Sequence, residues 1–287
     1  MLTNLLARRR RTRDPRLGAS IRVSGRRRTL RVPGFTYGLL GRALVDLTEV
    51  TLTAPSASGR TRIAFASDLH AGSPGWRHTL RSLIHVLRRV EPDHLILGGD
   101  LVDADLTFLP DILGPLSQAA GAFEIHAVRG NHDTRKGSHV EWRAHLDRFG
   151  VRDLTNQSAE LAPGIQIGGL DDGLRGRPDP EGLGREMDPD SLRIGVVHNP
   201  EEVAGLPEGL FDMILSGHTH GGQVCLPLFG ALRGPSAYTL NHFEGWARIG
   251  SHDALVSRGI GTVHIPVRLF CRAEAVVLDV RSESEEA

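Results

Sequence analysis

The sequence contains a single lysine, Lys136, and only two cysteines, Cys225 and Cys271, among 287 residues. Two isolated cysteines provide neither a disulfide framework nor a cysteine zinc motif, so we expect buried thiols and a reducing compartment. No apolar run approaches the ~18 residues that a membrane-spanning helix requires. The formal net charge is zero and aromatic residues make up 5% of the chain. Both features argue against a nucleic-acid-binding protein.

Positive charge is concentrated at the N-terminus, where residues 1–31 contain eleven arginines and one acid, Asp14. We predict a basic, flexible N-terminal extension over residues 1–35 and one folded domain over residues 36–287. The simplest interpretation of the extension is a solvated tail. The alternative is attraction to an anionic membrane, worth ~1 kcal/mol per basic residue. No apolar export signal is evident, so we expect a cytoplasmic protein, with a peripheral position on the inner face of the membrane as the alternative.

The first half of the chain alternates predicted strands and helices. Residues 37–47 carry an imperfect helical stripe, and residues 49–53 alternate as in an edge strand. Short apolar runs indicate strands at 62–66, 94–97 and 123–128. Helical spacing of apolar residues predicts helices at 77–90, 106–119 and 140–149.

The second half has a different rhythm. Residues 156–161 and 164–170 indicate antiparallel strands joined at Pro163-Gly164. Further strands are predicted at 192–197, 211–215, 255–260 and 273–280. We expect a short helix at 201–205 and a surface loop at 171–189, which is rich in glycine, proline and charge.

Polar residues follow strand after strand, at the positions Asp68, His70, Asp100, Asn131, His132, His198, His218 and His220. Ligands bind outside the carboxyl ends of strands in open α/β sheets. Carboxylates and imidazoles without thiolates suit Mn²⁺, Fe or Zn²⁺. Seven of these eight residues are possible ligands, more than the four or five that one ion needs, so we predict two divalent metal ions. Paired metals are a known device of phosphoryl chemistry.

The order of these motifs resembles the calcineurin-like metallophosphoesterase superfamily over about residues 49–280. The motifs are Asp68-x-His70, Gly99-Asp100, Gly130-Asn131-His132-Asp133, His198 and Gly217-His218-x-His220. The stretches 217–223 and 257–262, the latter followed by Pro266 and Arg268, are similar to a bacterial branch of small phosphodiesterases that includes cell-envelope members. The resemblance implies an α/β (α+β) fold, a four-layer α/β/β/α sandwich of two mixed β-sheets flanked by helices.

The resemblance also implies a role for each motif residue. One metal would be held by Asp68, His70 and His220, and the other by Asn131, His198 and His218. Asp100 would bridge the two metals, and a hydroxide between them would attack phosphorus in line. His132 would donate a proton to the leaving oxygen or stabilise its developing charge. Asp133 would orient a neighbouring residue.

The implied activity is that of a phosphodiesterase, acting on an envelope or lipid-linked phosphodiester or pyrophosphate. One alternative is a cyclic-nucleotide or phosphomonoester hydrolase, and another is a nuclease. An alternative of a different class is a non-catalytic metal-binding scaffold.

Several polar residues near the motifs have a structural interpretation beside the functional one. Arg129 could contact a phosphate, but strand alternation explains it equally well. His264 could line the substrate cleft, and Asp103 fits a turn or a helix cap better than a ligand. Surface or core positions are expected for the histidines outside the motifs: His78, His85, His94, His126, His139, His145, His242, His252 and His264.

Overall fold

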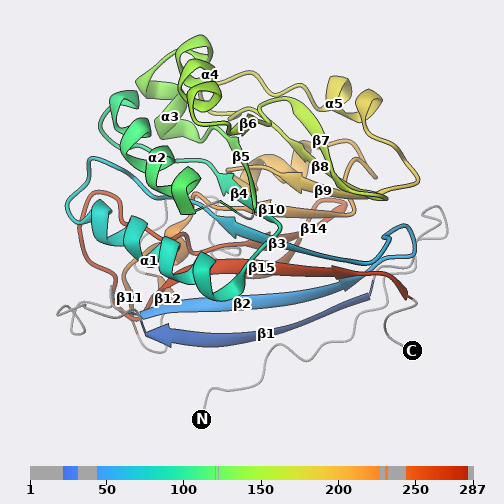
Figure 1. The fold of residues 1–287 in the computed structure, drawn as a ribbon, viewed down its shortest axis with the longest axis horizontal. Helices are drawn as coiled ribbons and strands as arrows, with labels where there is room; N and C mark the ends of the chain where they lie inside the picture. The colour runs from blue at the N-terminus through green and yellow to red at the C-terminus, as the bar shows by residue number, and fades with distance from the viewer. Residues whose placement is uncertain are drawn as a thin grey trace.

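The chain folds into two β-sheets packed face to face, with helices on both outer faces (Figure 1). The structure is a computed structural model and describes residues 22–31, 44–119, 121, 123–226, 230–231 and 244–283. The four layers confirm the predicted α/β/β/α sandwich of two mixed sheets.

The first sheet has seven strands. In spatial order they are β1 (Arg22–Arg31), β2 (Leu44–Thr53), β15 (Ala273–Arg281), β3 (Arg60–Ala66), β4 (His94–Gly98), β5 (Glu124–Val128) and β6 (Arg152–Asp153). From β3 to β6 neighbouring strands are parallel, whereas β15 is antiparallel to β3 and parallel to β2.

The second sheet has six strands, and a separate two-stranded ribbon consists of β11 (Cys225–Leu226) and β12 (Gly230–Ala231). The six strands are, in order, β13 (Gly245–Ile249), β14 (His252–Val256), β10 (Met213–Ser216), β9 (Leu192–Val196), β8 (Ile165–Gly169) and β7 (Gln157–Ala162). β8, β9, β10 and β14 are parallel, and the outer strands β7 and β13 are antiparallel to their neighbours.

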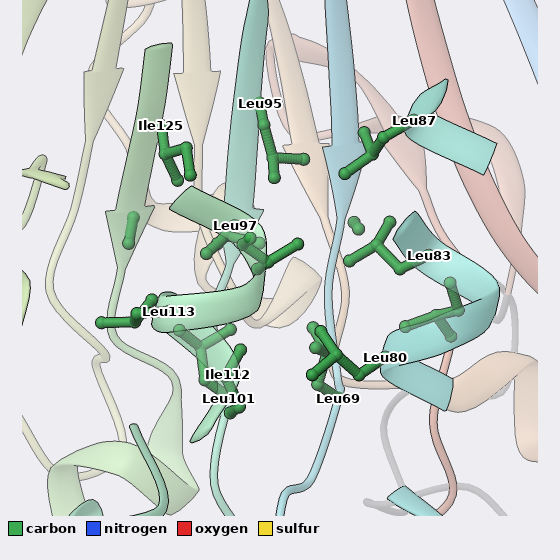
Figure 2. Close-up of a cluster of buried hydrophobic side chains, with 14 of the residues drawn as sticks. Leu69, Leu80, Leu83, Leu87, Leu95, Leu97, Leu101, Ile112, Leu113 and Ile125 are labelled. Atoms are coloured by element: carbon green, nitrogen blue, oxygen red, sulfur yellow. The ribbon is translucent and has the colours of Figure 1, made fainter. Parts of the chain in front are cut away.

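Helices α1 (Trp76–Val90), α2 (Leu109–Ala119) and α4 (His139–Arg148) contribute to the apolar layer on the outer face of the first sheet. The apolar residues of α1 recur at helical spacing, so Leu80, Leu83 and Leu87 lie on one buried face. Figure 2 shows them packed with side chains of α2 against Leu95 and other sheet residues. Burying one such leucine contributes ~1.5–3 kcal/mol.

A second apolar layer lies between the sheets, and strand β4 shows how both layers are filled. Leu95 and Leu97 face the helices, whereas Ile96 faces the other sheet, because successive side chains point to opposite faces. A parallel strand buried on both faces therefore reads as a continuous apolar run. On the far side, α5 (Pro180–Glu186) and the short helix η3 (Pro200–Gly205) cover the second sheet.

Several segments differ from the sequence-based expectations. The strand expected at 255–260 is β14, which begins at His252 and ends at Val256. Residues 22–31, expected within the flexible extension, form β1, which pairs with β2 along its whole length. Residues 44–47 begin β2 rather than ending a helix, and β2 lies inside the sheet rather than at its edge. The expected loop at 171–189 contains α5, which Asp179 caps by accepting a hydrogen bond from the Gly182 amide. Residues 1–21 and 32–43 lie outside the described residues.

Within the part of the chain that the structure describes, no helix combines the length and the apolar character needed to cross a bilayer.

Candidate metal centre

The predicted motif residues meet at one place because the carboxyl ends of parallel strands from both sheets converge there. β3, β4 and β5 carry the first three motifs, and β9 and β10 carry the last two. Backbone hydrogen bonds tie the turns together beyond the strand ends. The amide of Asp68 donates to Gly99 O at 2.9 Å, that of His70 to Asp100 O at 3.0 Å, and that of Gly217 to His198 O at 2.9 Å.

Five of the motif residues have a left-handed backbone, with φ between 50° and 66°: Asp68, His70, Asp100, His218 and His220. This region is unfavourable for residues with a Cβ atom and costs of order 1–3 kcal/mol each. Gly221 and Gly222 follow with φ of 59° and 78°, which glycine adopts without strain, so they permit a tight turn here. The sharp turns aim each side chain back toward the common point.

The first group of donors consists of Asp68, His70 and His220, all buried. Nε2 of His220 lies 3.0 Å from Nε2 of His70 and 3.4 Å from Oδ1 of Asp68. The Asp68 carboxylate accepts a hydrogen bond from Ser67 Oγ at 2.5 Å and from the amide of His218 at 3.1 Å. The turn after β10 is therefore fixed against the turn after β3.

The second group consists of Asp100, His198 and His218, with Asn131 beside it. Nδ1 of His198 donates to Gly98 O at 2.8 Å, so Nε2 is the nitrogen turned toward the metal-binding group. This buried Nε2 has no hydrogen-bond partner and faces Asp100 Oδ2 at 3.3 Å. Nδ1 of His218 lies 2.9 Å from Oδ1 of Asn131.

Asp100 stands between the two groups. Its Oδ2 atom lies 3.7 Å from Nε2 of His70 and 3.3 Å from Nε2 of His198, and its Oδ1 atom accepts a hydrogen bond from the amide of His132 at 2.8 Å. The two histidines of the Gly-His-Thr-His motif fall into different groups, as the resemblance implied.

The imidazoles fall into two classes of protonation: the pKa values of His218 and His220 are lowered, whereas those of His70 and His198 are raised by neighbouring carboxylates. Burial lowers the pKa of His218 to about 3 and that of His220 well below its usual range, so both rings are neutral at pH 7. Burial would also lower the pKa of His198, but the carboxylate of Asp100 raises it well above its ordinary value. Without a cation, protons on such rings balance part of the buried carboxylate charge, and a bound metal ion would displace them. The donor set therefore fits divalent cations.

His132 lies beside these groups but is held differently. Its ring packs edge-on against that of His70, with centroids 4.7 Å apart, and its Nδ1 lies 2.9 Å from Oδ1 of Asp103. The same Asp103 oxygen is 3.5 Å from Nδ1 of His70. Burial lowers the pKa of His132 to about 4. Asp103, interpreted from sequence as a turn or cap residue, thus faces two site histidines, as a carboxylate that orients metal-binding imidazoles does.

The remaining candidates are placed as follows. Asp133 is buried and accepts hydrogen bonds from the amides of Val102 and Gly130, at 3.0 and 2.9 Å. Arg129 is buried and donates to both carboxylate oxygens of Asp171 at 2.8 Å. His264 is exposed on the segment after the second sheet. Of these three, Asp133 has contacts that join two of the site's turns.

Arg268 is buried, and the sequence alone indicated no role for it in the site. It joins the turn after β10 to the segment after β14. Its guanidinium donates to four carbonyl oxygens, those of His220, Arg258, Gly259 and Gly261, at 2.7–3.2 Å. The amides of Ile260 and Gly261 in turn donate to Ser67 O and Asp68 O. Arg268 therefore holds the His220 turn against the turn that supports Asp68.

Replacing Arg268 with methionine is expected to destabilise the fold by about 2–3 kcal/mol, because four buried carbonyls lose their donor. Urea unfolding of the variant measures this loss. Arg248→Met, which removes an exposed ion pair with Asp253, is the control and is expected to cost less than about 1 kcal/mol. Equal stability of the two variants would contradict a stabilising role for the hydrogen bonds of Arg268.

Gly130→Ala is expected to weaken metal binding by about 10- to 100-fold. A methyl group at this position would lie 2.2 Å from Asp100 Oδ1 and 2.8 Å from His198 Nε2, so both donors must move. Titration of the metal-depleted chain with Mn²⁺ measures the change. Gly205→Ala, where the methyl group meets nothing within 4 Å, is the matched control, and equal affinities in both variants would contradict this packing.

The fold and the site together define a metal-dependent phosphoesterase. Residues 61–222 match the family of calcineurin-like phosphoesterases, and the chain belongs to this metal-dependent family. It is therefore a phosphoric ester hydrolase, which argues against the alternative of a non-catalytic scaffold.

Three relatives illustrate the match. The chain is 28% identical over 248 residues to the uncharacterized metallophosphoesterase YkuE of Bacillus subtilis (strain 168), covering 83% of this chain and 86% of that protein. It is 30% identical over 229 residues to phosphodiesterase YaeI of Escherichia coli (strain K12), covering 76% and 82%. A transmembrane protein with a metallophosphoesterase domain from Bos taurus is 29% identical over 246 residues, covering 78% and 54%.

Proposed function

We propose that this chain is a phosphodiesterase that uses two divalent metal ions. The observation that carries the proposal is the position of Asp100 Oδ2, between His70 Nε2 at 3.7 Å and His198 Nε2 at 3.3 Å. One carboxylate oxygen thus faces both donor groups. In this proposal Asp68, His70 and His220 hold one ion, Asn131, His198 and His218 hold the other, and Asp100 contributes to both.

The exposure of the site residues gives the direction from which a substrate would approach. Asn131, His132 and His218 are partly exposed, whereas Asp68, His70 and Asp100 are buried. A phosphoryl group would therefore enter on the side of His132. Divalent ions, when bound, would neutralise phosphoryl charge and generate a nucleophile from water. His132 would act on the leaving oxygen through Nε2 while Asp103 holds Nδ1. Because burial lowers its pKa to about 4, donation of a proton uses the minor, protonated form of the ring.

Similarity to phosphodiesterase YaeI supports a phosphodiester as the substrate class. Hydrolysis of a cyclic nucleotide or of a phosphomonoester is the alternative. The test is to compare turnover of bis(p-nitrophenyl) phosphate and p-nitrophenyl phosphate by the purified chain with Mn²⁺, and to measure bound metal. We expect about two equivalents of Mn²⁺, preference for the diester, and loss of turnover on chelation that Mn²⁺ restores. Preference for the monoester would overturn the substrate class, and one equivalent would overturn the paired-metal arrangement.

An amphiphilic or lipid-linked substrate is favoured by an apolar surface attached to the metal-binding turn. Ile265, Leu269 and Phe270 are among the most exposed large apolar side chains of the described residues, with Phe270 at 71%. Gln223, which ends the His218–His220 turn, holds this segment. Its amide nitrogen donates to Val263 O and Ile265 O, and its backbone carbonyl accepts from the amide of Leu269.

Phe270→Ser is expected to raise KM several-fold for a long-chain phosphodiester and to leave KM for bis(p-nitrophenyl) phosphate unchanged, because only the former has an apolar part to bury. Val140→Ser removes another highly exposed apolar side chain, on α4, and is the control. Equal effects on both substrates would contradict an apolar subsite.

The proposal extends to contact between the arginine-rich N-terminus and an anionic membrane. Because residues 22–31 form β1, the truncation that tests it is confined to residues 1–21. Unchanged sedimentation with anionic liposomes would exclude this contact.

A further inference from the structure

Away from the metal centre, one further group of histidine and carboxylate side chains among the described residues brings three donor atoms together: His94, Glu124 and His126. They lie at the beginning of β4 and β5, whereas the metal centre lies at the ends of these strands. His94 is paired in register with Glu124, and His126 is two residues further along β5. All three side chains therefore share the face of the sheet that meets the second sheet.

The donor atoms are spaced as a small metal ion requires. Nε2 of His126 lies 3.4 Å from Nδ1 of His94, and each of these nitrogens lies 3.7 Å from Oε2 of Glu124. Ligands at about 2.0–2.1 Å from a tetrahedral ion lie about 3.3 Å from one another. Three atoms already near that separation need only a small contraction to bind the ion.

The tautomer of each ring decides whether a lone pair faces this point. Nε2 of His94 pairs with Leu161 O at 2.9 Å, which places the ring proton on Nε2 and leaves Nδ1 bare. Nδ1 of His126 is buried without a hydrogen-bond partner. A proton on Nδ1 presents the Nε2 lone pair to an ion, whereas a proton on Nε2 makes the hydrogen bond to His94 Nδ1. A histidine whose second nitrogen donates to a backbone carbonyl, as His94 does, is the usual arrangement of a metal ligand.

An ion can reach this group from solvent. The Glu124 side chain is 73% exposed. Together with His126 it lines a surface cavity of about 320 Å³, which also involves Ser117, Phe149 and Arg152. With three protein ligands, a tetrahedral ion would have a fourth position open to water.

We propose that His94, Glu124 and His126 form a second, separate site for a divalent transition-metal ion of the zinc class. Through His94 and Leu161 the bound ion would connect the beginnings of β4 and β5 to β7 of the second sheet. The alternative is a plain hydrogen bond between the two imidazoles, without metal. The proposed site shares no residue with the metal centre and does not depend on the phosphodiesterase proposal.

The test is to titrate the metal-depleted full chain with Zn²⁺ in competition with a chromophoric chelator. Glu124→Gln keeps the size of an exposed side chain and removes one ligand, so it is expected to lose one equivalent or to weaken one class of site by about tenfold or more. Glu141→Gln, an exposed glutamate on α4, is the matched control and is expected to bind as the unmodified chain does. Turnover with saturating Mn²⁺ is expected to be unchanged in both.

His126→Gln is a second variant that is expected to lose the same equivalent. Because His126→Gln replaces a buried ring, its circular dichroism spectrum is first compared with that of the unmodified chain. If this variant does not fold, the result for Glu124→Gln decides. Identical Zn²⁺ stoichiometry and affinity in Glu124→Gln and the unmodified chain would overturn the site and leave the hydrogen-bonded histidine pair. Failure of the metal centre to bind would change the total number of equivalents but not this difference.

Discussion

Asp100→Asn is expected to lower turnover of a phosphodiester by about 10³-fold or more and to reduce the amount of bound metal. The substitution keeps the shape of the side chain and removes the negative charge that faces His70 and His198. Charge stabilisation by a metal is worth several kcal/mol, and each ~1.4 kcal/mol is a factor of ten in rate. Asp100 is buried, so solvent cannot replace the lost charge.

Metal analysis and steady-state kinetics on the same preparation check this prediction. Asp111→Asn is the control, since this carboxylate is exposed and forms only a surface ion pair with Arg77. Retention of both metal equivalents and of full turnover in Asp100→Asn would exclude a carboxylate shared between two ions.

His132→Gln is expected to lower kcat by about 10²- to 10⁴-fold while the bound metal stays unchanged. The reason is that His132 would act on the leaving oxygen, and general acid catalysis contributes factors of this size. The loss should be larger for an alkyl ester than for p-nitrophenyl esters, whose leaving group needs no proton. Kinetics with both leaving groups, alongside metal analysis, measure the difference.

A different outcome would reassign this residue. His132 also lies within reach of His70 and Asp100 as a third donor. If His132→Gln loses metal in the same proportion as it loses turnover, the imidazole is a ligand and not a proton donor. His85→Gln, on α1 and remote in sequence from every motif, serves as the control.

Much of the site could be predicted from the sequence, because each motif stands directly after an apolar run. Parallel strands bring their carboxyl ends to one edge, so residues such as Asp68 and Asp100 must lie close once the strands are recognised. The separation of His218 from His220 into two donor groups followed from the family resemblance and is seen in the structure. Assignment of individual ligands remains a prediction.

What escaped prediction depends on contacts between residues far apart in sequence. Arg268 lies 48 residues beyond His220, and no local pattern indicates that its guanidinium reaches that carbonyl. Asp103 could have been found as the second carboxylate after β4, but its contact with His132 is a tertiary one. β1 was missed because its arginine-rich sequence resembles a solvated tail, although its backbone pairs fully with β2.

The position of β15 has a consequence for the order in which the protein can fold. β2 joins the first sheet only through β15, which is inserted between β2 and β3. β1 and β2 are synthesised early, but they can join the rest of the first sheet only after residues 273–281 have been synthesised. The same strand supports the metal centre, because the amide of Glu274 donates to Gly259 O beside Asp68. Pairings this distant in sequence are slow to form. A ribosome-bound chain that stops before residue 273 would contain every proposed metal ligand. It would still lack β15, the strand that connects β2 to β3.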